Sequence, residues 1–147
     1  MKFPFGSKSK TRQEKTILFV CVENAGRSQM AEGFFRKYAP EGYEPVSAGT
    51  KPISQINPTV VQVMSEIGVD IKQQKPKDIT EHMIRDSTKI VNMCCMDKSF
   101  CPTLFIPNLI DWGIEDPKGK PIEQVREIRD DIEQRVKQLV TDLPKDN

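Results

Sequence analysis

Cys21 and Arg27 stand six positions apart in the segment ILFVCVENAGRSQMAEGFF, where an apolar run gives way to a polar loop. A cysteine thiolate is a strong nucleophile, and thiols beside cations or helix N-termini ionise more easily than free thiols. An arginine guanidinium offers a planar fork that fits two oxygen atoms of a tetrahedral oxyanion. The pair therefore predicts a site in which Cys21 attacks the central atom of an oxyanion held by Arg27.

The residues around this pair could complete an anion-binding loop. Successive backbone N–H groups in a strand-to-helix loop can point inward and bind an anion, and the helix N-terminus adds its positive dipole end. Asn24 would hold the loop through hydrogen bonds to the backbone, and Ser28 would hydrogen-bond the thiolate. The C-x5-R spacing alone is weak evidence, because a buried strand cysteine before a surface loop also produces it. The predicted oxyanion-binding loop comprises Val22, Glu23, Asn24, Ala25, Gly26 and Ser28.

Alternating strands and helices are expected to position this loop. Residues 16–22, TILFVCV, are a short run rich in β-formers, which predicts a buried strand ending beside Cys21. Such an alternation predicts a single α/β domain with a four-stranded parallel sheet flanked by helices, a Rossmann-like arrangement of three layers. The further strands are expected at 44–49, at 88–93 and within 101–108, and the helices at 28–38, 57–67, 78–83 and 122–140.

Ligands of parallel sheets bind beyond the carboxyl ends of the strands. Cys21 ends the first expected strand, and Cys94 and Cys95 follow the third. We therefore expect these three thiols at the same edge of the sheet.

Composition narrows the class of protein. The chain has 147 residues, with 22 Lys+Arg against 21 Asp+Glu, so charge does not favour nucleic-acid binding. No apolar stretch approaches the ~20 residues that cross a bilayer, and no signal peptide is evident, so we expect no membrane partner and a cytoplasmic location. Residues 1–15 are expected to form a flexible basic tail before a domain at 16–143, and the four cysteines are expected to be reduced.

Several motifs together resemble a known family. VCVENAGRSQMAEGF resembles the phosphate-binding loop of the low-molecular-weight protein tyrosine phosphatase superfamily, and RSQMAEG, SAGT and WGIEDPKGK are similar to its thioredoxin-coupled arsenate reductase branch. The resemblance covers about residues 16–140. It implies that Cys21 is the nucleophile, Arg27 the oxyanion clamp and Asp116 the general acid that protonates the departing oxygen. By itself, an Asp-Pro pair such as Asp116-Pro117 more often marks a plain turn.

The remaining cysteines separate the branches of this family. Cys94 and Cys101 resemble the resolving pair of the arsenate reductases, which implies a thiol relay that ends as a Cys94–Cys101 disulfide, open to a thioredoxin-type reductant. Cys95 is an alternative attacking thiol. The expected substrate is arsenate or a phosphate-type oxyanion.

Two other functions stay open. The first is a low-molecular-weight phosphatase that hydrolyses phosphomonoesters through a cysteinyl-phosphate, although Lys118-Gly119-Lys120 stand where such phosphatases usually have aromatic residues. The second is a non-catalytic oxyanion- or metal-binding module.

The resemblance also bears on cofactors. No tightly bound cofactor is expected, but some family members bind potassium near the loop, at positions that match Asn24, Glu32, Ser47 and Asp78 here. Many relatives have a cysteine directly before the loop arginine, where this chain has Gly26.

Overall fold

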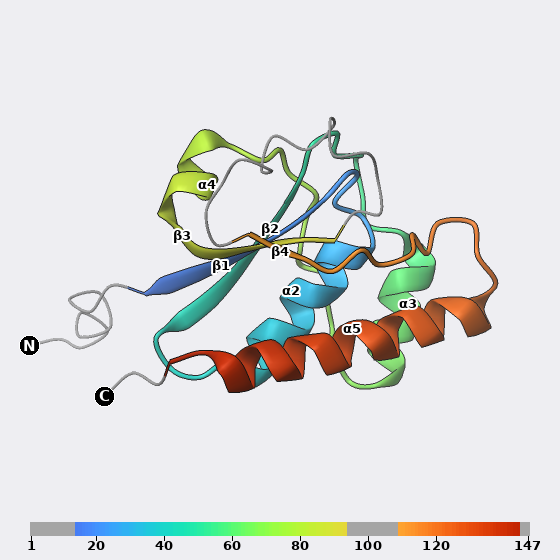
Figure 1. The fold of residues 1–147 in the computed structure, drawn as a ribbon. Coiled ribbons are helices and arrows are strands. Elements are labelled where there is room, and N and C mark those ends of the chain that lie inside the picture. The colour runs from blue at the N-terminus through green and yellow to red at the C-terminus, as the bar shows by residue number, and fades with distance from the viewer. Residues whose placement is uncertain (1–13, 94–108, 145–147) are drawn as a thin grey trace, which may run out of the picture.

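A parallel sheet with strand order β2–β1–β3–β4 forms the centre of the molecule (Figure 1). The computed structural model describes residues 14–93 and 109–144. The strands are β1 (Lys15–Cys21), β2 (Tyr43–Gly49), β3 (Ser87–Asn92) and β4 (Leu109–Asp111), and each neighbouring pair is parallel. The α/β fold with a four-stranded parallel sheet is therefore confirmed.

Helices cover both faces of this sheet, as Figure 1 shows. Along β1, Ile17, Phe19 and Cys21 face a large apolar core, while Leu18 and Val20 face a smaller one. This division follows from the two-residue side-chain period of a strand. The large core is covered by α2 (Arg27–Tyr38), α3 (Pro58–Glu66) and α5 (Ile122–Asp142), and the small core by α4 (Glu81–Asp86).

Local sequence signals explain the start of α3 and the buried face of α5. Asn57 caps α3 by accepting a hydrogen bond from the Thr59 N–H, and Pro58 occupies the first helical position. Helix α5 carries its predicted apolar stripe: Ile122 is half-buried, and Val125, Ile128, Ile132, Val136 and Leu139 are buried.

Two predicted elements need comment. The predicted start of the helix expected at 78–83 was wrong by three residues, since α4 begins at Glu81. Asp78 pairs with Gly49 in an isolated bridge, and the Thr80 side chain caps the helix by accepting a hydrogen bond from the Met83 N–H. The strand expected within 101–108 lies outside the described residues, and the fourth strand observed is Leu109–Asp111.

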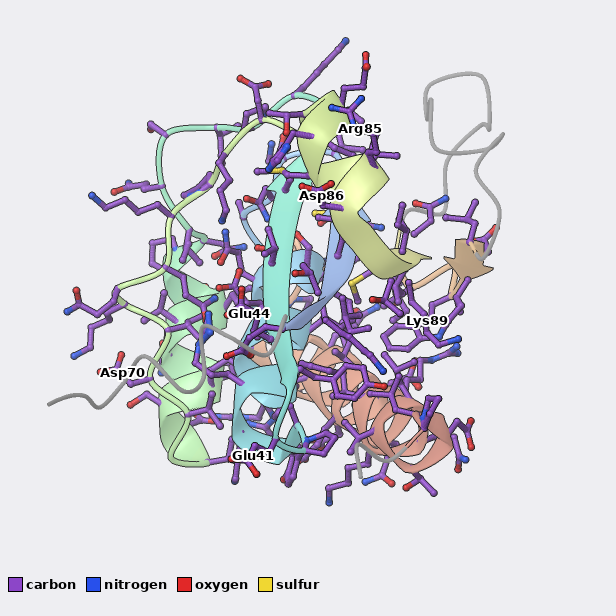
Figure 2. All side chains as sticks on the ribbon, turned by 90° about the vertical axis from the view of Figure 1, so that its left-hand side faces the viewer. Glu41, Glu44, Asp70, Arg85, Asp86 and Lys89 are labelled. Atoms are coloured by element: carbon purple, nitrogen blue, oxygen red, sulfur yellow. The ribbon has the colours of Figure 1, made fainter. Side chains whose placement is uncertain are left out.

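The surface around the edge strand β2 carries charges of both signs. Figure 2 shows acidic and basic side chains interspersed here, including Glu44 on β2 and Arg85 and Asp86 on α4. Glu44 is exposed, and the following Pro45 has no N–H to offer a further strand. Both features discourage edge-to-edge pairing. Among the helices of residues 14–93 and 109–144, none is long and apolar enough to cross a membrane.

Candidate active site

In the loop between β1 and α2, the backbone carbonyl groups point outward, toward neighbouring hydrogen-bond donors. The carbonyl oxygens of Cys21, Val22, Glu23 and Ala25 accept hydrogen bonds from backbone N–H groups of residues 50–57, and the carbonyl of Asn24 accepts one from the Gln29 side chain. In a trans peptide the C=O and the next N–H point in opposite directions. The N–H groups of residues 22–26 therefore point away from these partners, which is the arrangement of an anion-binding nest.

Asn24 holds this shape. Its φ of 52° lies in the left-handed region, which asparagine tolerates better than most residues. The fully buried side chain donates hydrogen bonds to Ser28 Oγ at 2.8 Å and Ser47 Oγ at 3.1 Å, and it accepts one from the Lys77 N–H at 2.9 Å. Gly49 at the end of β2 is required here, since a Cβ would lie 2.5 Å from Val22 O and 3.0 Å from Asn24 N.

The candidate nucleophile lies at the base of the loop. Cys21 is 2% exposed, and its Sγ lies 2.8 Å from Ser28 Oγ. A hydroxyl at this distance can donate a hydrogen bond to a thiolate, as predicted for Ser28. Cys21 is the one free cysteine among the described residues.

Arg27 begins α2 and is 6% exposed. Its Nη1 donates to the carbonyl oxygens of Met93 at 3.3 Å and Ile114 at 2.7 Å, and its Nη2 lies 3.7 Å from Asp116 Oδ2. The guanidinium thus connects the loop to the end of β3 and to the segment that carries the candidate acid.

That segment forms an exposed turn. Asp116 Oδ1 accepts a hydrogen bond from the Lys118 N–H at 3.0 Å. Hydrogen bonds from Gln124 and Lys120 lower the pKa of the neighbouring Glu115. Asp116, and not Glu115, lines the cavity above Cys21.

One cavity of about 320 Å³ brings Cys21, Arg27 and Asp116 together. Loop residues Glu23, Ala25 and Gly26 form one side of it. The other lining residues are Ile53, Gln55, Ile56, Asn57, Pro58, Pro117 and Lys118.

The candidate potassium residues are brought together only in part. Ser47 Oγ donates to Glu32 Oε1 and accepts from Asn24, while Asp78 is exposed. Glu32 Oε2 accepts from Arg36, and Lys77 Nζ lies 4.0 Å from Oε1. The side-chain oxygens of Asn24, Ser47 and Glu32 are thus engaged with protein donors, and a potassium ion beside Glu32 would compete with the Lys77 ammonium. Potassium binding stays a prediction, with Lys77 as its competitor.

Cys94, Cys95 and Cys101 lie outside the described residues. Met93, the last described residue before them, accepts a hydrogen bond from Arg27 through its carbonyl oxygen.

Sequence reasoning missed three parts of the chain that help to shape the site. Gln29, which is fully buried, braces the loop at Asn24 O, and residues 50–57 turn its carbonyls outward. Lys118 pairs with Glu23 at 3.0 Å. The partners of Lys118 and of residues 50–57 lie far away in the chain, so no local sequence signature marks them. Gln29 lies five positions from Asn24, and a glutamine beside the loop motif is a signal that sequence reasoning could have used.

A buried cysteine under a nest of N–H groups, with an arginine and a carboxyl on one cavity, defines an enzyme that acts on oxyanions through a thiolate. The comparisons agree. The model of the low molecular weight phosphotyrosine protein phosphatase family matches residues 16–147, and the chain belongs to this family.

Two similar proteins are named arsenate reductases. The chain is 36% identical to an arsenate reductase of Brevibacillus brevis over 127 residues, covering 86% of this chain and 94% of that one. It is 35% identical to arsenate reductase 2 of Staphylococcus saprophyticus over 128 residues, covering 86% and 96%.

Among solved structures, an arsenate reductase in a phosphate-binding state superposes with a TM-score of 0.80 at 30% identity, covering 88% of this chain and 99% of that one. An arginine phosphatase from Geobacillus stearothermophilus superposes with a TM-score of 0.73 at 26% identity, covering 86% and 91%.

Proposed function

We propose that this enzyme is an arsenate reductase that uses a cysteine relay and a thioredoxin-type reductant. The observation that carries the proposal is the single cavity in which Cys21 Sγ lies under a nest of inward-pointing N–H groups beside Arg27 and Asp116. The relatives named arsenate reductase support the choice of substrate.

In the first step, the nest and Arg27 hold the arsenate oxygens. The Cys21 thiolate forms an S–As bond, and one As–O bond breaks as Asp116 supplies the proton with which that oxygen leaves as water. Preorganised N–H groups stabilise the negative charge that accumulates on the remaining oxygens.

In the second step, the Cys94 thiolate attacks Cys21 Sγ. The S–S bond forms while the S–As bond breaks, and its electron pair reduces arsenic from the +5 to the +3 state, which releases arsenite. Cys101 then attacks Cys94, frees Cys21 as a thiolate and leaves the Cys94–Cys101 disulfide. A dithiol protein of the thioredoxin type supplies the two electrons that reduce this disulfide.

The second candidate function is phosphomonoester hydrolysis, which needs Cys21, Arg27, Asp116 and a water molecule. The observation in its favour is the size of the cavity. A tetrahedral oxyanion needs the room of a few water molecules, about 100 Å³, whereas the cavity holds about 320 Å³ and has Ile53, Ile56 and Pro58 on its wall.

Variants of Cys94 and Cys101 distinguish the two functions. We expect Cys94→Ser and Cys101→Ser to abolish thioredoxin-coupled arsenate reduction while most aryl phosphate hydrolysis remains, and Cys21→Ser to abolish both. Peptide mapping after one turnover of the Cys101→Ser variant should detect a Cys21–Cys94 disulfide. Cys95→Ser tests which neighbouring thiol attacks: it should reduce arsenate normally if Cys94 is the attacker, and the results of the Cys94 and Cys95 variants swap if Cys95 is. Full arsenate reduction by the Cys94→Ser, Cys101→Ser double variant would refute the relay.

A further inference from the structure

Two oppositely charged side chains meet at the solvent side of the cavity that contains Cys21. Lys118 Nζ lies 3.0 Å from Glu23 Oε2, and both residues line this cavity together with Arg27. Glu23 belongs to the oxyanion loop and Lys118 to the turn that carries Asp116. The ion pair therefore joins the two segments between which a substrate must enter.

A carboxylate is an unexpected neighbour for a site that binds anions. The charge of Glu23 repels an incoming dianion unless a cation neutralises it. Lys118 supplies this cation. The hydrogen bond to Glu23 and the charges of Glu23 and Asp116 raise the pKa of Lys118 above its ordinary value.

The pair is held loosely enough to exchange partners. The Lys118 side chain is 66% exposed and that of Glu23 is 31% exposed. Exposed ion pairs of this kind contribute little to the stability of a folded protein. A bound dianion with charge −2 competes well against a single carboxylate for the ammonium group.

We propose that Lys118 is a second oxyanion-binding cation, which Glu23 holds beside the cavity and releases to a tetrahedral dianion. The proposal rests on the oxyanion site described above and deepens it. The affinity of the site for an oxyanion then depends on the Glu23–Lys118 pair as well as on Arg27, because the entering anion must compete with Glu23 for Lys118.

Inorganic phosphate is the probe, with binding measured by titration calorimetry on the full chain. Glu23→Gln removes the competitor of the anion and should lower the phosphate Kd about threefold, within the range of an exposed pair. Lys118→Met removes the cation, leaves Glu23 unpaired and should raise the Kd about fivefold or more. The Glu23→Gln, Lys118→Met double variant should fall between the two.

Lys120→Met is the matched control. Lys120 pairs with Glu115 at 3.2 Å on the same turn but does not line the cavity, so its loss should leave the phosphate Kd unchanged. High salt should shrink the differences between the variants, since exposed charges are screened.

Opposite shifts for the two single variants are the result that supports the proposal. A loss of phosphate affinity in both single variants would show that the pair only holds the turn in place, and no change in either would show that Lys118 does not reach the anion. Both outcomes overturn the proposal. Arsenate turnover is measured in parallel. A chain that binds phosphate with the expected pattern but never reduces arsenate would refute the proposed function and leave the role of Lys118 intact.

Discussion

The oxyanion loop and the turn that carries Asp116 face each other across one cavity, yet they are held in different ways. In the loop, the side chains of Asn24, Ser28 and Cys21 are 0–2% exposed and hydrogen-bond one another. In the turn, Asp116 is exposed, and its neighbour Lys118 is held by an ion pair at the surface.

This difference separates two tasks of the enzyme. Stabilising a developing charge requires N–H groups fixed before the reaction, which buried and fully satisfied hydrogen bonds provide. Delivering a proton and admitting a substrate require a group that can shift, which an exposed turn allows. We therefore expect changes in the loop to affect both stability and activity, and changes in the turn to affect activity alone.

Asn24→Ala should have the largest effect. It removes the buried hydrogen bonds to Ser28 and Ser47 and puts alanine at φ 52°. Unsatisfied buried groups cost about 1–3 kcal/mol and left-handed backbone about 1–2 kcal/mol. Chemical denaturation should show a loss of about 3 kcal/mol, together with at least a tenfold loss of phosphatase kcat/KM.

Asn24→Gly is the matched control, since glycine adopts this φ without strain. It should recover about 1 kcal/mol of the lost stability, the part due to backbone strain, but not the activity. If Asn24→Ala unfolds at the denaturant concentration of the wild type, the loop is not held by this side chain.

Asp116→Asn tests the turn. If Asp116 supplies the proton to the leaving group as proposed, its replacement should slow hydrolysis of phosphate esters with poor leaving groups by about 10²-fold, the lower range for such catalysis. Esters with good leaving groups should be slowed much less, because they leave without a proton.

The free energy of unfolding of Asp116→Asn should stay within about 0.5 kcal/mol of the wild-type value, as for other surface substitutions. Equal slowing of both classes of ester would show that Asp116 acts only through Arg27, from which it lies 3.7 Å.

The same division explains what the sequence could predict. The order strand, loop, helix around Cys21 and Arg27 is local, so the apolar run and the helical periodicity after Ser28 predicted it correctly. The turn is different, because its anchor Glu23 lies 95 positions from Lys118. Only the fold brings such partners together, and no local pattern marks them.

The misplaced start of α4 has a similar cause. We expected a helix over residues 78–83, but the backbone on both sides of Asp78 bonds to Gly49, at the end of β2. Sheet contacts of this kind override local propensity, and they also direct Lys77 rather than Asp78 toward the loop.

The smallest expected effect concerns the support of the loop by Lys77, whose Nζ lies 4.0 Å from Glu32 Oε1. If Lys77 fills the role of a potassium ion, replacing choline chloride by potassium chloride at equal ionic strength should not change the Tm of the wild type. In Lys77→Met, Glu32 loses one of its two cationic neighbours and keeps Arg36 and the Ser47 hydroxyl. Potassium should then raise the Tm by about 2 °C, which corresponds to about 0.5 kcal/mol. Lys72→Met, a change at an exposed lysine, should show no potassium effect.

A clear rise of the wild-type Tm in potassium would instead mean that the ion binds beside Asn24, Glu32 and Ser47 and displaces Lys77. The buried loop would then depend on a cation from solution, and its contrast with the exposed turn would be smaller than the protein contacts indicate.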